Sequence, residues 1–261
     1  MPQNYPATSL SDNFLLTGGI YHSQNQAYND WFEKQYSRNE EPWNYSHRGG
    51  EIFRHKFTIQ QLREFCPHPC ALLELGCGSG LMTAKLASFT SKLYAADVSL
   101  SAVKACKQKC DPVARKHNCE IEYYVTTTPG LPFNDGSFDT VTLCDGLLGW
   151  WFTEEQKQAA LKDTYRALQK GGYIILTDYT TADHFADYIK LVNQSAFKIV
   201  KITYLHDRPW YLLESLAKKL PFKSLLKPIV ASPHLAKLLH YSGRIIGPTS
   251  SRHIIIVARK E

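Results

Sequence analysis

The sequence predicts an α/β fold with a mainly parallel sheet, and three observations lead to that prediction. A short apolar run at 71–75 is typical of a buried strand, and alternating glycines and a helical apolar spacing follow it. A second strand-like segment, 92–97, ends on an acidic residue. Helix-like and strand-like segments then alternate along the chain, which is the order of βαβ units.

The glycine-rich turn is the centre of this prediction. It begins at Glu74 and places Gly76, Gly78 and Gly80 between the first strand and a helix. Such a turn presents backbone N–H groups and the positive end of the helix dipole to a ligand, because a Cβ would block close approach of the backbone. A dinucleotide fingerprint would have glycine at position 81, where this chain has Leu81.

Asp97 ends the second predicted strand, 23 residues after Glu74. That distance is close to the interval of roughly 20 residues at which a carboxylate meets ribose hydroxyls in nucleotide-binding folds. A carboxylate suits the task because it accepts two hydrogen bonds from a vicinal diol. Alone, Asp97 is equally well explained as a surface residue; together with the glycine turn it predicts a ribose contact.

Composition limits the class of protein. The chain has 261 residues, 44% of them hydrophobic and 21% charged, which fits one domain or a domain with an appendage. No apolar run approaches a membrane span, and the start lacks a signal-peptide pattern, so we expect a cytoplasmic protein. Seven cysteines predict free thiols in a reducing compartment, and the spacing of Cys66/Cys70 and Cys106/Cys110 is wider than zinc sites use, so no metal is expected.

Positive charge is concentrated in the C-terminal third. The net charge is +6, and the segment Lys190–Glu261 holds 13 Lys and Arg against 3 Asp and Glu. This asymmetry favours an acidic partner, a membrane surface or an anionic substrate. A solvated basic face is the alternative explanation.

The N-terminal region contains few periodic patterns. Residues 1–23 are expected to be irregular, because prolines and the pair Gly18–Gly19 interrupt any period. Aromatic residues at three- and four-residue spacing predict a helix at about 24–36. The element Pro42-Trp-Asn-Tyr45 follows, and a helix that ends near Phe65 comes after it.

The segment 131–141, Leu-Pro-Phe-Asn-Asp-Gly-Ser-Phe-Asp-Thr-Val, leads into a fourth strand that ends at Asp145. In open α/β sheets, side chains just beyond the carboxyl end of a strand face the ligand crevice. Core packing is the alternative for the two tryptophans that follow. The residues expected near the ligand or its reaction partner are Asp145, Gly146, Leu147, Trp150 and Trp151.

The Glu-x-Gly-x-Gly-x-Gly turn, Asp97, the 131–141 segment and the Gly171–Gly172 turn resemble, in this order, the motifs of the class I S-adenosylmethionine-dependent methyltransferases. The resemblance covers about residues 40–205 and the final strand. It implies a Rossmann-like, seven-stranded, mostly parallel sheet with helices on both faces and an antiparallel last strand. It also implies an N-terminal helical cap, a helical insertion between strands six and seven, and S-adenosyl-L-methionine as the cofactor.

The Pro-Trp-x-Tyr element followed by Arg54 is similar to the cap of small-molecule methyltransferases such as the nodulation N-methyltransferases and thiopurine methyltransferases. In such caps aromatic and arginine side chains close over the methionine end of the cofactor; an aromatic staple is the alternative role. Many members bind the adenine amino group through an aspartate where this chain has Thr127, so a hydroxyl or a backbone amide would replace it. The resemblance assigns to the cofactor site Trp43, Tyr45, Arg54, Glu74, Gly76, Cys77, Gly78, Gly80, Asp97, Val98, Thr127, Thr128, Asp145, Gly146 and Leu147.

Four parts of the chain are predicted: a cap at 1–66, the core at 67–205, an insertion at 206–251 and the last strand at 252–261. The insertion pattern indicates two short basic amphipathic helices broken by prolines. We expect it to be a lid or dimer surface that shapes the acceptor pocket, in a monomer or homodimer. Docking on a membrane surface near a lipidic substrate is the alternative.

The resemblance implies direct in-line transfer of the sulfonium methyl group to N, O or S of a small, amphiphilic or aromatic acceptor. Holding donor and acceptor in line can supply roughly 7–11 kcal/mol. A general base is needed only if the acceptor loses a proton early. The candidate bases are His22, Asp178, Tyr179, His184, His206 and His240, and the candidate substrate contacts are Trp150, Trp151 and Tyr179.

Four alternatives are considered. Asp145 and Asp178 end adjacent strands, as the magnesium ligands of catechol-type O-methyltransferases do, but Tyr179 stands where that family has asparagine. A nucleic-acid methyltransferase fits the basic third of the chain, but such enzymes usually carry Asp/Asn-Pro-Pro-aromatic where this chain has Asp145-Gly-Leu-Leu. A lipid-linked acceptor and a non-catalytic, cofactor-binding partner protein are the remaining alternatives.

Overall fold

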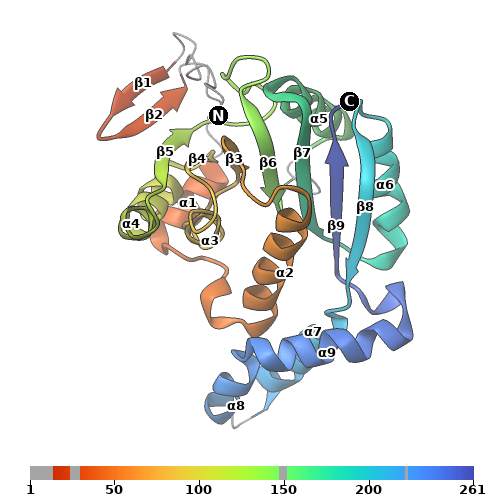
Figure 1. The fold of residues 1–261 in the computed structure, drawn as a ribbon. Helices are drawn as coiled ribbons and strands as arrows, with labels where there is room; N and C mark the ends of the chain where they lie inside the picture. The colour runs from red at the N-terminus through yellow and green to blue at the C-terminus, as the bar shows by residue number, and fades with distance from the viewer. Residues whose placement is uncertain (1–13, 24–29, 147–151, 221–222) are drawn as a thin grey trace.

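The computed structural model describes residues 14–23, 30–146, 152–220 and 223–261, in which nine strands form one sheet (Figure 1). The strand order is β1-β2-β5-β4-β3-β6-β7-β9-β8. Neighbours from β5 to β7 are parallel, and β9 is antiparallel to both β7 and β8. The strands are β1 (Phe14–Thr17), β2 (Ile20–Ser23), β3 (Leu72–Leu75), β4 (Lys92–Asp97), β5 (Glu120–Val125), β6 (Phe138–Cys144), β7 (Leu168–Tyr179), β8 (Lys198–Leu205) and β9 (His253–Arg259).

Helices cover both faces of the sheet. The apolar residues of α5 and α6 pack on one face, and those of α2, α3 and α4 pack on the other. Within the described ranges, no helix has the length and apolar character needed to cross a bilayer. The helices are α1 (Asp30–Arg38), α2 (Gly49–Phe65), α3 (Thr83–Leu86), α4 (Leu100–His117), α5 (Glu154–Ala167), α6 (Phe185–Asn193), α7 (Arg208–Lys219), α8 (Lys223–Val230) and α9 (Pro233–Ile246).

The predicted fold class is confirmed, because strands β3 to β9 reproduce the Rossmann-like sheet with its antiparallel last strand. The strand count is larger than the seven predicted. The two additional strands, β1 and β2, form an antiparallel hairpin whose second strand pairs parallel with β5.

The expectation that residues 1–23 are irregular is wrong for this hairpin. Gly18 and Gly19 have φ values of 60° and 73°. Two consecutive residues with positive φ are what a tight two-residue hairpin turn requires, so glycine is favoured at both. The pair therefore closes the hairpin instead of interrupting the structure.

The insertion between β8 and β9 contains three helices, α7 to α9, not the two expected. Pro233 begins α9 next to the capping residue Ser232, a position at which the missing N–H of proline costs nothing. The insertion lies at the end of the molecule beyond α2 (Figure 1). It packs closely on α2, because a Cβ at Gly50 would lie 2.4 Å from the ring of the buried Trp210.

Candidate functional site

A cavity of about 1170 Å³ lies at the carboxyl ends of the parallel strands. It is lined by residues that follow β3, β4, β5 and β6, and it is covered by α1, by the segment that leads into α2 and by α7. Its volume is somewhat above the usual range for small-molecule sites, about 300–1,000 Å³. The position agrees with the rule that predicts ligand crevices in open α/β sheets.

The glycine turn forms one wall of this cavity. Gly76 and Gly78 have φ values of 79° and 50°, and the Gly78 N–H donates to Asp97 Oδ2 at 2.9 Å. The helix that follows, α3, has only four residues. A helix this short has a small dipole, so the predicted contribution of a helix dipole to ligand binding is minor. Gly80 does not line the cavity; a Cβ there would lie 2.7 Å from Cys110 Sγ, which makes Gly80 a packing position against α4.

Asp97 is held in place by backbone amides. Its Oδ2 accepts from Gly78 N and its Oδ1 accepts from Ser99 N, both at 2.9 Å. Burial raises the pKa of this carboxyl group. Each carboxylate oxygen has two acceptor positions, so Asp97 can still accept two hydrogen bonds from a diol.

Threonines follow β5 where many family members have aspartate. Thr126, Thr127 and Thr128 all line the cavity. The hydroxyl groups of Thr126 and Thr128 are buried and have no hydrogen-bond partner in the described part of the chain. Buried hydroxyl groups are costly when unpaired, so these two fit a polar ligand edge.

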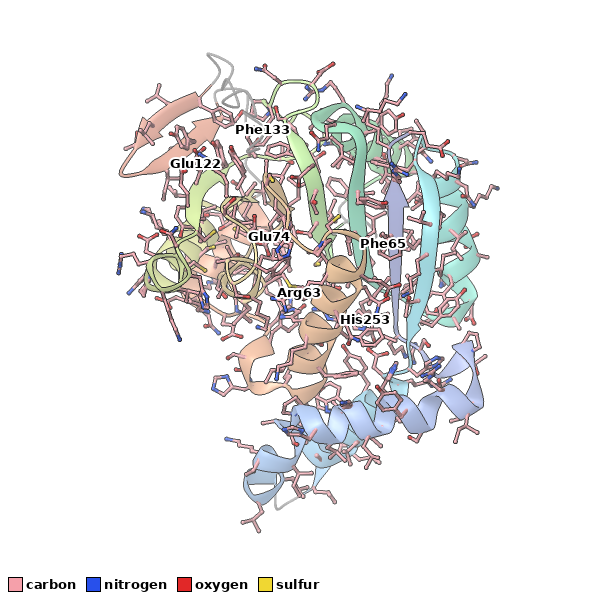
Figure 2. All side chains as sticks on the ribbon, viewed as in Figure 1. Arg63, Phe65, Glu74, Glu122, Phe133 and His253 are labelled. Carbon is pink, nitrogen blue, oxygen red and sulfur yellow. The ribbon has the colours of Figure 1, made fainter. Side chains whose placement is uncertain are left out.

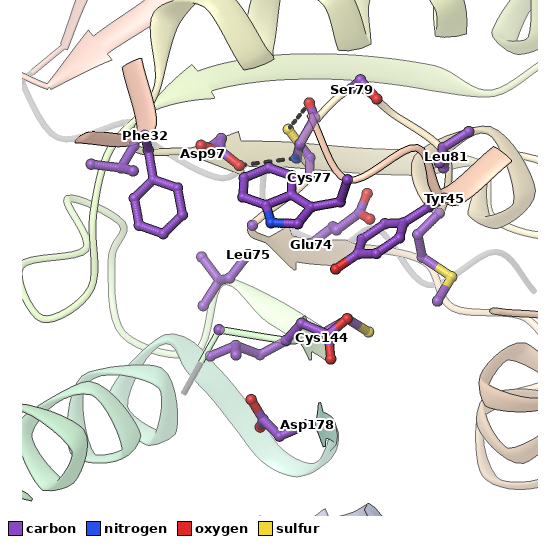
Figure 3. Close-up of a pocket in the computed structure, with 18 of the residues that line it drawn as sticks. Phe32, Tyr45, Glu74, Leu75, Cys77, Ser79, Leu81, Asp97, Cys144 and Asp178 are labelled. Carbon is purple, nitrogen blue, oxygen red and sulfur yellow. Dashed lines mark hydrogen bonds between the residues drawn. The ribbon is translucent and has the colours of Figure 1, made fainter. Parts of the chain in front are cut away.

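Glu74, near the end of β3, is one of the residues that line the cavity (Figure 3). The side chain is buried, and its Oε2 has no hydrogen-bond partner among the described residues. Burial raises the pKa of Glu74 to about 8. The carboxyl group is therefore mostly neutral at pH 7 in the free protein.

Aromatic rings from α1 and the following segment cover the glycine turn. The rings of Tyr36 and Trp43 have centroids 5.3 Å apart, and Trp43 stacks on Tyr45 at 6.3 Å. The hydroxyl of Tyr36 lies 2.6 Å from the position of a Cβ at Gly78. The sequence indicated Trp43 and Tyr45 but not the α1 aromatics, of which Trp31, Phe32 and Tyr36 line the cavity.

Buried ion pairs form the opposite wall. Arg54 is 1% exposed; its Nε donates to Glu51 Oε2 at 2.8 Å and its Nη2 lies 2.6 Å from Asp145 Oδ2. Burial opposes ionisation of Glu51, but Arg54, His253, the Tyr211 hydroxyl and Arg48 together outweigh it and lower the pKa of Glu51 to about 2. Arg54 Nη1 and Asp145 Oδ1 have no hydrogen-bond partner among the described residues, so both can receive a polar ligand.

A histidine that the sequence did not indicate lies beside these ion pairs. His253 Nδ1 is 2.5 Å from Asp207 Oδ2, and His253 Nε2 is 3.7 Å from Asp145 Oδ1. Burial alone would lower the pKa of His253, but the charge and hydrogen bond of Asp207, together with the charge of Asp145, outweigh it and raise the pKa. The ring contacts those of Tyr179 and Tyr211, with centroids 5.2 and 6.0 Å away (His253 is labelled in Figure 2).

Most of the residues that the sequence predicts for the cofactor are brought together. Leu147, Trp150 and Trp151 lie outside the described residues. Of the predicted substrate and base residues, Asp178 and Tyr179 line the cavity. The cofactor residues that line it are Trp43, Tyr45, Arg54, Glu74, Gly76, Cys77, Gly78, Asp97, Val98, Thr127, Thr128, Asp145 and Gly146.

The four histidines predicted as bases are not brought to the cavity. His22 lies on the hairpin strand β2. His184 and His206 bond to hydroxyl groups outside it, those of Thr181 and Ser250. His240 is buried with ring centroids 5.2–5.4 Å from Phe53 and Phe57, and its Nδ1 accepts from the backbone of His206. None of the four lines the cavity, so the structure places none of them beside the predicted cofactor residues.

Comparison with known proteins identifies the core. Residues 73–176 match the family described as "Methyltransferase domain". The chain carries a class I methyltransferase domain. The predicted family is thereby confirmed, and S-adenosyl-L-methionine is the cofactor of that family, as predicted.

The methyltransferase domain has relatives among characterised proteins. Over 112 residues it is 32% identical to the ubiquinone/menaquinone biosynthesis C-methyltransferase UbiE of Escherichia fergusonii. The match covers 42% of each protein, so the chain matches less than half the length of this relative.

Solved structures share the fold at low identity. N-methyltransferase NodS from Bradyrhizobium japonicum WM9, in complex with S-adenosyl-L-homocysteine, has a TM-score of 0.58 and 16% identity over 88% of this chain and 97% of that one. The [4+2]-cyclase SpnF has a TM-score of 0.57 and 17% identity over 79% and 80%. The fold therefore accommodates more than one reaction, and activity has to be argued from the site.

Proposed function

We propose that this chain transfers a methyl group from S-adenosyl-L-methionine to a small amphiphilic or aromatic acceptor. One observation supports the proposal above all others: a single cavity joins the glycine turn and Asp97 to the buried group of Arg54, Asp145 and His253. The first set suits a nucleoside, and the second suits a polar organic molecule that must be oriented beside it.

The residues present fit this cofactor. Asp97 has acceptor capacity left for ribose hydroxyl groups, and the hydroxyls of Thr127 and Thr128 can bond the adenine edge. Glu74, with its unpaired oxygen at the turn, can accept from a cationic amino group. The bound cofactor supplies an electrophilic methyl group on a sulfonium, and Trp43 and Tyr45 keep water from that end of the cavity.

His253 is the proposed proton acceptor. Asp207 fixes its Nδ1, which leaves Nε2 on the side of Asp145 and the cavity. The family resemblance of the sequence implies N, O or S as the acceptor atom. Carbon is a further candidate, because the relatives include enzymes named C-methyltransferases. Where the acceptor must lose a proton, an oriented imidazole can take it, whereas an acceptor with a free lone pair needs only positioning.

The test begins with calorimetric titration of the cofactor. Turnover is then measured as release of S-adenosyl-L-homocysteine with a set of phenol, quinol and amine amphiphiles, and mass spectrometry and NMR locate the new methyl group. Binding with turnover on one acceptor class is the expected result. Binding without turnover on any acceptor would favour a non-catalytic partner protein, and absence of cofactor binding would overturn the proposal.

A further inference from the structure

The insertion, residues 206–251, leaves apolar side chains uncovered on all three of its helices. Nine large apolar residues on or directly after α7, α8 and α9 are exposed, against five in the rest of the described chain. Scattered apolar residues are normal on surfaces, but a cluster marks an interaction site. This outer face of the insertion consists of Leu212, Leu216, Leu220, Leu225, Ile229, Leu238, Tyr241, Ile245 and Ile246.

The outer face points away from the body of the protein. α7 buries Trp210 and Ala217; around the helix axis Leu212 lies about half a turn from them and Leu216 about a third of a turn. α9 packs on α2 and is arranged in the same way, so both helices turn apolar residues outward. Ile245 is 90% exposed and Leu225 is 74% exposed, which excludes a role for either in shaping the acceptor cavity.

The exposed charge of the insertion is positive. The segment contains seven Lys and Arg but only two acidic residues, Asp207 and Glu214. Both acidic side chains are buried and paired, with His253 and Arg48 respectively. The exposed basic residues among the outward leucines and isoleucines are Arg208, Lys218, Lys219, Lys227, Lys237 and Arg244.

We propose that the outer face of the insertion docks on an anionic lipid bilayer. Amphipathic helices that combine exposed apolar residues with Lys and Arg lie in the interface plane of membranes, where apolar burial and attraction to anionic headgroups add. A second copy of the chain fits less well, because the basic residues would face one another without acidic partners.

A second cavity gives this docking a consequence for the site. It has a volume of about 870 Å³ and lies between the cap and the insertion, where Leu226 and Val230 contribute apolar lining. It shares Trp43 and Arg48 with the larger cavity. If the proposed function holds, a docked insertion would give an acceptor dissolved in the bilayer a route to the larger cavity. The docking itself does not depend on the methyl-transfer reaction.

The experiment is co-sedimentation of the full chain with phosphatidylcholine vesicles, with or without phosphatidylglycerol. Binding is expected to the mixed vesicles only and to weaken as salt rises. Replacing Lys219 and Lys237 by glutamine should lower partitioning about fivefold per lysine. The double variant Leu225→Glu/Ile245→Glu should abolish sedimentation.

Leu16→Glu is the matched control, because Leu16 is also exposed, at 57%, but lies on the β1 hairpin. It should bind vesicles as the parent does, and all variants should keep the parent's thermal unfolding and cofactor affinity. If the parent stays in the supernatant, or if the double variant still sediments, the proposal is wrong. A parent that is dimeric by light scattering, and that the double variant makes monomeric, would assign the face to a homodimer instead.

Discussion

The two walls of the cavity are built in different ways. The cofactor wall consists of backbone turns at strand ends, in which Gly78 and Ser99 amides hold Asp97. The acceptor wall consists of side chains from distant segments, such as Glu51 and Tyr211, whose side chains bond although 160 residues separate them. A wall of backbone groups depends on local conformation, whereas a wall of buried charges depends on every partner being present. The acceptor wall should therefore respond more sharply to substitution.

The largest effect is expected from Arg54→Met, which removes the buried cation that Glu51 and Asp145 share and leaves Glu51 with Arg48 as its ion-pair partner, at 3.3 Å. Removing one partner of a buried ion pair costs about 3–5 kcal/mol of the free energy of unfolding. Arg166→Met is the control, because Arg166 also bridges two acids, Asp135 and Asp163, but is a third exposed. Equal losses for both variants in urea unfolding would contradict the proposed contrast.

Asp97→Ala should come next, by weakening cofactor binding. Loss of charge-assisted hydrogen bonds worth about 1.5–3 kcal/mol each corresponds to about 100-fold or more in Kd, measured by calorimetry. Asp139→Ala is the matched control. Asp139 also accepts hydrogen bonds from two backbone amides, those of Cys70 and Ala71, but it lies at the amino end of β6, at the other end of the parallel strands from the cavity. An unchanged Kd for Asp97→Ala would remove the basis of the cofactor assignment.

His253→Asn is expected to lower kcat about 100-fold, with little change in cofactor Kd. Because Asp207 raises the pKa of His253, the neutral ring is populated only above the ordinary histidine pKa, so the rate should rise with pH there. The variant should lose this rise. His206→Asn, on the insertion but outside the cavity, should keep the pH profile. Retention of the rise by His253→Asn would exclude the histidine as the base.

The effect that is smallest for a change of one pH unit concerns Glu74 in the free protein. Its pKa is about 8 in the folded state against 4.5 unfolded, so the unfolded state loses its proton first as pH rises. Between these values the free energy of unfolding should fall by about 1.4 kcal/mol per pH unit on account of Glu74. Glu74→Gln should flatten that slope in urea titrations at several pH values. A slope identical to the parent's would show that Glu74 is not held neutral.

The same contrast explains what the sequence could predict. The cofactor wall follows from local patterns, the glycine turn and an acid at a strand end, and these place Asp97 and Thr127 correctly in the cavity. His253 was missed because its role depends on pairing with Asp207, 46 residues away. The hairpin was missed because Gly18–Gly19 is compatible with either an interruption or a turn until the flanking strands are seen to pair.

Helix α2 links the two regions through its first turns. Gly49 and Gly50 touch the insertion there, since a Cβ at Gly49 would lie 2.4 Å from the backbone oxygen of Ser232. Arg54, one turn further along the same helix, sits in the cavity wall. Any tilt of the insertion must therefore shift the Arg54 guanidinium group as well. The orientation of the acceptor beside Arg54 then depends on the surface that α7, α8 and α9 contact.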